Sequence, residues 1–171
     1  EDGPMREIHP HFFAGANANA DILAGGEMHA EMAEARLKSA ARIELILPKE
    51  AVPGGELSFD VVVHNVAAGH NIPTGITELR QMWVDLRILD ANGTIIFRSG
   101  ELDEHGEIRP ETIWFGAIAG DKSGKQTHKP WEITQFLANR TVPPKGSIRS
   151  TLVAKVPAGV RGPVSIEAKL L

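Results

Sequence analysis

The sequence predicts an all-β fold, an Ig-like antiparallel β-sandwich of about seven strands, preceded by an extended N-terminal arm and one α-helix. Short runs of alternating apolar and polar residues recur through residues 41–171, as in a sandwich. Turn residues separate these runs, and the 17 glycines and 11 prolines among 171 residues exceed the average share. Only residues 27–40 have the composition of a long helix. We therefore expect an arm and helix over residues 1–40 and a sandwich domain over residues 41–171.

The N-terminal part is expected to contain little regular structure before Glu27. Residues 1–26 show no sustained period of 2 or 3.6, and one helical turn is expected at 19–24. From Glu27 to Ala40 the residues are mostly strong helix formers, without Gly or Pro. Four residues spaced as one helical face are expected to pack on an apolar surface. They are Met28, Met32, Ala35 and Ser39.

Strands are expected after Ala40, where the hydrophobic period changes to two. The expected strands cover residues 43–47, 57–64, 82–89, 94–97, 148–156 and 164–171, with weaker candidates at 108–115 and 132–137. Turn residues at 52–55, 90–93 and 157–159 separate neighbouring strands. The last strand reaches Leu171 with no turn behind it, which predicts that more chain follows.

Composition argues against several classes of function. The net charge is −4 without a Lys/Arg cluster, so nucleic acid and anionic membrane surfaces are not expected as partners. No apolar run is long enough for membrane insertion. The absence of cysteine excludes disulfides, thiolate metal sites and covalent haem attachment. Since H-E-x-x-H, G-x-S-x-G, G-x-G-x-x-G and the P-loop are all missing, we do not expect an enzyme.

The candidate site is the loop that follows the expected strand at 57–64. Seven histidines stand in the chain, and His70 lies in this glycine-containing loop. Gly69 permits a tight turn, Pro73 stiffens the loop and Gly75 permits positive φ, so the loop can present His70 in a fixed direction. The alternative is a structural loop whose imidazole hydrogen-bonds to a neighbouring carbonyl. His29, His105 and His128 are expected to be surface residues.

Several segments carry one pattern from about His9 to Leu171. They are His11-x-Phe13-x-Gly15-x-Asn17 in the arm, G-H-x-x-P-T-G at 69–75, Arg80, Trp83, Asp90-x-x-Gly93, Ser99-Gly100, Asp121-x-x-Gly124 and the closing strand at 164–170. Together they resemble the haem-free β-domain that follows the haem-binding part of certain multihaem c-type cytochromes. That family attaches its haems through C-x-x-C-H motifs, and this sequence has none.

The resemblance implies an accessory role in electron transfer. Haem c would be attached to a haem-bearing module of the same parent protein or to a partner cytochrome subunit. A bis-histidine haem takes its distal ligand from any residue that reaches the iron. The resemblance thus implies His11 and His70 as axial ligands of haem iron, with His9 third, and a location in the periplasm or at the cell surface.

Two other functions remain open from the residues. An extracellular β-sandwich module often binds carbohydrate or protein through its loops, and Trp83, Trp114 and Trp131 could form a stacking platform, although Trp83 lies in an expected strand. A mononuclear metal site could instead combine His64, His70 and a carboxylate, without support from ligand spacing.

Overall fold

The computed structural model of the protein describes residues 15–23 and 25–171. The chain divides into two compact units, with the boundary between Ala40 and Ala41. The first unit contains two helices, α1 (Ala18–Leu23) and α2 (Glu27–Ala40). The second contains nine strands and one short 3₁₀ helix, η1 (Thr77–Leu79), among its residues. The prediction of an all-β sandwich-like fold is confirmed.

The position of α2 agrees with its composition, but the predicted apolar face is wrong. Met28 is 58% exposed, Ala35 and Ser39 are also exposed, and only Met32 of the four is half-buried. The buried residues are Ala30 and Ala33, three positions apart and therefore on one face. Helix α1, which the sequence predicted only as a turn, packs against α2. Small alanine side chains allow two helices to approach closely, so here methyl groups are buried rather than methionines.

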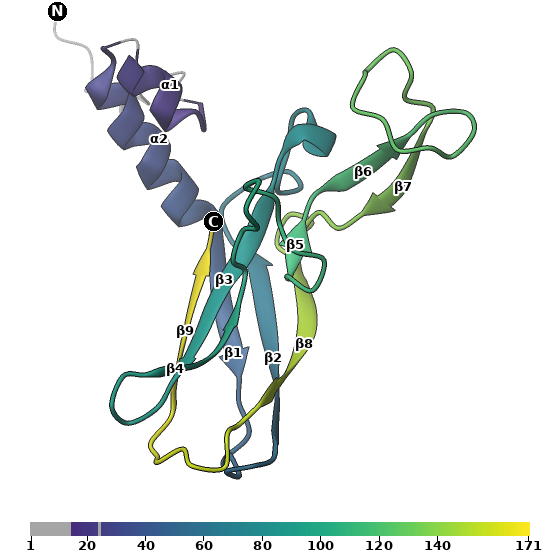
Figure 1. Ribbon diagram of the computed structural model, residues 1–171. Helices are drawn as coiled ribbons and strands as arrows, with labels where there is room; N and C mark the ends of the chain where they lie inside the picture. The colour runs from purple at the N-terminus through teal and green to yellow at the C-terminus, as the bar shows by residue number, and fades with distance from the viewer. Residues whose placement is uncertain (1–14, 24) are drawn as a thin grey trace, which may run out of the picture. The chain divides into compact units, whose positions relative to one another are not determined.

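Two antiparallel sheets form the sandwich (Figure 1). The first has the order β1-β2-β8, and the second has β3 at its centre, with β4 and β5 along one edge and β9 along the other. A separate two-stranded ribbon consists of β6 and β7. The strands are β1 (Ala41–Ile46), β2 (Glu56–Asn65), β3 (Met82–Leu89), β4 (Ile95–Ser99), β5 (Trp114–Phe115), β6 (Ala117–Gly120), β7 (Gln135–Asn139), β8 (Ser147–Lys155) and β9 (Ser165–Leu170).

The weaker strand predictions required correction. Of the candidate at 108–115, only Trp114–Phe115 forms a strand, because the Thr112 N–H donates to the Arg109 carbonyl in a turn. Strand β6 was not predicted, since three of its four residues, two alanines and a glycine, have low β propensity. The candidate at 132–137 begins later, at Gln135. The described part of the chain thus has nine strands rather than about seven.

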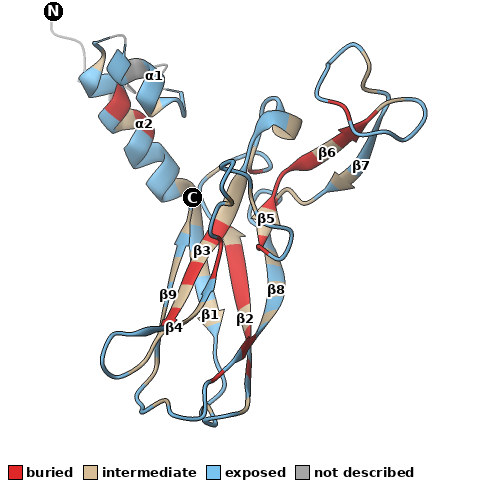
Figure 2. Ribbon diagram, viewed as in Figure 1, coloured by how far each residue is buried: buried red, intermediate tan, exposed pale blue. Residues whose placement is uncertain are grey.

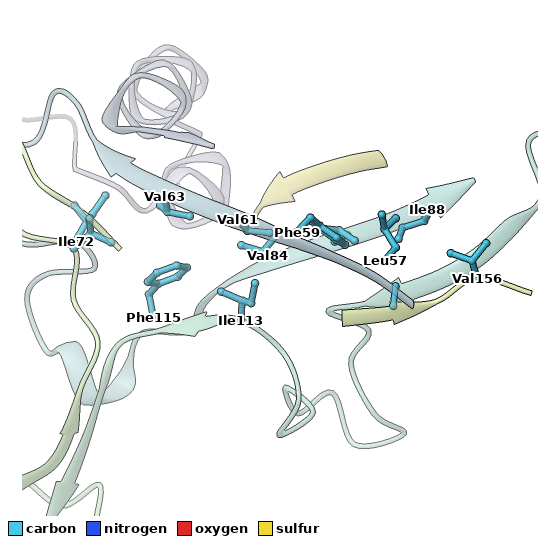
Figure 3. Close-up of a cluster of buried hydrophobic side chains, with 13 residues drawn as sticks. Leu57, Phe59, Val61, Val63, Ile72, Val84, Ile88, Ile113, Phe115 and Val156 are labelled. Carbon is cyan, nitrogen blue, oxygen red and sulfur yellow. The ribbon is translucent and has the colours of Figure 1, made fainter. Parts of the chain in front are cut away.

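The hydrophobic core lies between the two sheets. Alternate residues of β2, from Leu57 to Val63, face alternate residues of β3, from Val84 to Ile88 (Figure 3). Phe115 of β5 is also fully buried in this cluster. Buried residues are correspondingly frequent along β2 and β3, and β6 of the ribbon also has several (Figure 2). Because β2 and β3 have core neighbours along most of their length, they provide a rigid base for the loop that joins them.

Three loops share one Asp-x-x-Gly turn. In each, the aspartate Oδ1 accepts the backbone N–H groups two and four residues later, while the aspartate N–H donates to the carbonyl four residues later. The turns begin at Asp90, Asp103 and Asp121. Sequence analysis identified the first and third and missed the second, although its D-x-x-G spacing is the same. These hydrogen bonds favour the charged carboxylate.

These turns predict a loss of stability in acid. The N–H of Thr94 lowers the pKa of Asp90, the N–H of Glu107 that of Asp103, and the hydroxyl of Ser123 that of Asp121. A carboxyl whose pKa is lower in the folded state stabilises the fold above its unfolded pKa. The free energy of unfolding should therefore be level above about pH 5 and fall as the pH drops below about 4. Urea unfolding at several pH values measures this. In a variant with all three aspartates replaced by asparagine, the free energy of unfolding should fall less between about pH 5 and acid pH than in the wild type. An equal fall in both proteins would contradict the prediction.

Candidate functional site

The candidate site is the loop between β2 and β3, which begins where β2 ends at Asn65. At its other end, β2 begins beside the turn at 52–55, so the loop lies at the opposite end of the sandwich from that turn (Figure 1). His70 is exposed on this loop. Sequence analysis predicted this placement of His70 from the glycines and proline around it. The surrounding hydrogen bonds show how the position is maintained.

Asn65 connects the loop to the sandwich. Its side chain is buried, with 1% of the residue exposed. Its Nδ2 donates to the carbonyl of His70 at 2.7 Å and to the carbonyl of Val142 at 3.2 Å. Its Oδ1 accepts the N–H of Ala68 at 3.1 Å. One carboxamide thus satisfies three backbone groups and fixes the loop on both sides of Gly69.

The residues after His70 are attached to the segment that precedes β8. Ile72 and Val142 form an antiparallel bridge, in which each N–H donates to the other's carbonyl, at 3.0 and 2.7 Å. Asn71 Nδ2 donates to the Thr141 hydroxyl at 3.0 Å. Ile72 and Val142 are both buried and belong to the core cluster. The loop therefore has fixed points directly before and after the histidine.

The imidazole of His70 makes one hydrogen bond of its own. Nδ1 lies 3.0 Å from the carbonyl oxygen of Asn71. A carbonyl oxygen only accepts, so Nδ1 carries the proton and Nε2 of the neutral ring keeps its lone pair. Histidines that bind metal commonly have their second nitrogen held in this way. The contact is also what a purely structural loop would show, so both interpretations of the loop agree with this geometry.

The mononuclear metal site is not formed. His64 lies on the outer face of the first sheet, where its Nε2 is 2.7 Å from Glu44 Oε2. Within residues 15–23 and 25–171, no group of three or more His, Cys, Asp or Glu side chains is arranged to hold a metal ion. The hypothesis that His64, His70 and a carboxylate share one metal is therefore wrong. Successive strand residues point to opposite faces, so His64 is directed away from the core between its buried neighbours Val63 and Asn65.

Apart from His70, no histidine proposed as a ligand of haem iron lies among the residues that the structure describes. His9 and His11 lie outside the described residues. His29, His105 and His128 are exposed, as predicted. His105 Nε2 lies 3.5 Å from Glu104 Oε1, and His128 Nε2 lies 3.5 Å from the Gln126 amide nitrogen. Of the three residues proposed as haem ligands, the structure therefore describes only His70.

The tryptophans do not present three rings to solvent. Trp83 is half-buried and its Nε1 donates to the Gly100 carbonyl at 3.1 Å. Trp114, its partner on β5, is half-buried, and the Arg140 guanidinium carbon lies 5.5 Å from its ring centre. Trp131, in the loop between β6 and β7, is 80% exposed. The three tryptophans therefore do not form a single stacking surface.

Comparison with known proteins gives one structural similarity. No protein-family model matches the chain, and no curated protein matches it significantly. The fold is similar to the crystal structure of a penta-heme cytochrome c552 from Thermochromatium tepidum, with a TM-score of 0.59 and 20% sequence identity. The similar region covers 80% of this chain and 33% of the cytochrome chain, so this chain spans a third of that length. At this identity the similarity establishes a shared fold.

The helices bear on the question of membrane insertion. Across the ranges that the structure describes, every helix falls short of the length and apolar character required to cross a membrane.

Proposed function

We propose that the protein is an accessory domain or subunit of a multihaem c-type cytochrome. It takes part in electron transfer by shielding haems and by donating distal histidine ligands. The observation that carries this proposal is the His70 ring, whose Nδ1 is held by the Asn71 carbonyl and whose Nε2 keeps a lone pair on an exposed loop. The fold shared with a penta-heme cytochrome supports the same conclusion.

The residues fit a ligand role and not an attachment role. The chain has no cysteine, so the haem c must be attached to a haem-bearing module of the parent protein or to a partner subunit. His70 would supply an axial imidazole, and His11 and His9 are proposed as further donors from the arm. Axial ligand identity and the burial of the haem set its reduction potential, so the domain would tune electron transfer without catalysis of its own. Haem c is assembled outside the cytoplasm, hence the proposed periplasmic or cell-surface location.

Residues that precede and follow His70 in the sequence expose apolar side chains suited to an apolar partner. Val66 precedes His70 in the loop, and Ile76 and Leu79 follow it before β3. Each of these three side chains is more than half exposed. Exposed apolar groups close to a functional loop are typical of an interaction surface. Contact with the apolar edge of a haem would remove them from water and shield the haem at the same time.

A titration with a haem c peptide tests the ligand role of His70. The peptide carries one histidine ligand and leaves the sixth position of its iron open, so binding of an imidazole produces a low-spin visible spectrum. We expect His70→Ala to weaken coordination by about tenfold or more, roughly 1.4 kcal/mol. His105→Ala, which removes another exposed imidazole, should behave as the wild type. His11→Ala and His9→Ala test the arm in the same assay. Unchanged titrations for all three candidate residues would refute the ligand role.

An alternative function is a carbohydrate- or protein-binding module. It is favoured by the exposed ring of Trp131 and by Phe136 on the neighbouring strand β7, which is 58% exposed. Aromatic rings on a surface are suited to stacking against apolar partners. Quenching of Trp131 fluorescence by oligosaccharides, together with a haem titration that does not depend on the histidines, would favour this alternative.

A further inference from the structure

We infer that Asn65 is the positioning residue of this site, because it sets the direction of the His70 ring and the ring nitrogen that carries the proton. This inference rests on the proposed function, since it concerns how the chain prepares His70 as a ligand. Asn65 itself is buried and lies at the end of β2, so it would act only through the loop backbone.

The first step is the peptide group that follows His70. Its carbonyl accepts Asn65 Nδ2 at 2.7 Å, the shorter of the two hydrogen bonds that this nitrogen donates. The peptide group is planar, so fixing its carbonyl also fixes the direction of the adjoining Asn71 N–H. The backbone on the carbonyl side of His70 therefore cannot rotate without breaking this part-buried hydrogen bond.

The second step is the next peptide group, between Asn71 and Ile72. The Ile72 N–H donates to the Val142 carbonyl at 3.0 Å, and planarity then fixes the Asn71 carbonyl. This is the carbonyl that accepts the His70 Nδ1 proton. The Val142 carbonyl also accepts Asn65 Nδ2 at 3.2 Å. The buried Asn65 side chain is thus bound directly to the first peptide group, and it shares with the Ile72 N–H the Val142 carbonyl that holds the second.

The consequence is a preorganised imidazole. A free histidine side chain changes rotamer and exchanges its proton between the two ring nitrogens. Here both choices are restrained before any ligand arrives, with Nε2 left to coordinate. Outer partners that orient a metal-binding histidine typically contribute 10- to 100-fold in metal affinity. Loss of Asn65 should therefore weaken coordination of iron while His70 itself is still present.

Long-range ¹H–¹⁵N correlation spectra of the His70 ring test this inference at pH 8. In the wild-type chain we expect the proton on Nδ1. In Asn65→Ala and Asn65→Ser we expect a shift towards the Nε2–H form that free histidine prefers, with about 10- to 100-fold weaker coordination of the haem c peptide. Leu57→Ala is the matched control, because it removes buried contacts from the opposite end of β2 and should leave the ring signal unchanged.

The outcomes separate this inference from the proposed function. If both Asn65 variants keep the Nδ1–H form and wild-type affinity, or if Leu57→Ala produces the same change, Asn65 is merely structural and the inference is wrong. Should neither Asn65 variant fold, the wild-type spectrum decides, since an Nε2–H ring would overturn the inference. If His70→Ala leaves haem coordination unchanged while the ring tautomer still depends on Asn65, the proposed function fails and the positioning of the ring stands.

Discussion

Replacement of Gly100 by alanine is expected to destabilise the protein by about 3–5 kcal/mol. Gly100 follows β4 with φ +96°, and it lies directly against the backbone of β3. A Cβ atom would overlap the Val84 carbonyl oxygen and would lie 2.7 Å from the Asp85 Cα. Backbone atoms of a central strand cannot move aside as a flexible side chain can. The displacement would also disturb the hydrogen bond from Trp83 Nε1 to the Gly100 carbonyl.

Gly106 provides the matched control for this experiment. It has a similar φ of +81°, but no atom lies within 4 Å of the position that a Cβ would take. Gly106→Ala should therefore cost only the left-handed backbone strain, about 1–2 kcal/mol. Urea unfolding of both variants at pH 7 separates steric overlap from strain. Equal losses in the two variants would show that the close approach of Gly100 to β3 contributes nothing.

The second large effect is expected at Phe115. This residue of β5 is 1% exposed and belongs to the core between the sheets (Figure 3). Removal of a buried phenyl ring loses its transfer free energy and leaves a cavity, so Phe115→Ala should reduce the free energy of unfolding by about 3–5 kcal/mol. Strand β5 has only two residues, so this ring is a principal link between the segment that follows β4 and the core.

Phe136→Ala makes the same chemical deletion at the surface. Phe136 is 58% exposed on β7, so the change in stability should be about 0.5 kcal/mol or less. Thermal or urea unfolding of the two variants compares burial directly, since the residue type is identical. A loss at Phe136 as large as that at Phe115 would mean that Phe136 is covered in solution, and a small loss at Phe115 would contradict its place in the core.

Much of the fold was predictable because some segments carry a strong local pattern. Residues 57–61 and 84–88 alternate between apolar and polar side chains, and they lie in the two strands that contribute most of the buried side chains. The composition of residues 27–40 predicted α2 with its bounds. Strand β6 was not predicted because three of its four residues are small, and its partner β7 lies 15 or more positions away in the chain. Small residues indicate no strand until the partner is known.

In the candidate site, too, the features with a local sequence pattern were predictable and those that depend on distant residues were not. Gly69, Pro73 and Gly75 marked a loop suited to presenting His70, and the structure places His70 on that loop. The importance of Asn65 was not predicted, because one of its partners, Val142, lies 77 positions away. The pairing of His64 with Glu44 also joins distant residues, on adjacent strands. Among the described residues no third ligand side chain joins such a pair, so the metal site suggested by the proximity of His64 and His70 in the sequence is not formed.

The sequence by itself determined the all-β class, the long helix, the central strands and the exposed loop of His70. Those features depend on local periodicity, on propensity and on the backbone freedom of glycine and proline. Only the tertiary structure decided which face of α2 is buried, where β6 pairs, and how Asn65 restrains the backbone that directs the His70 ring. These features depend on contacts between segments far apart in the chain, and such contacts leave no periodic signal in the sequence.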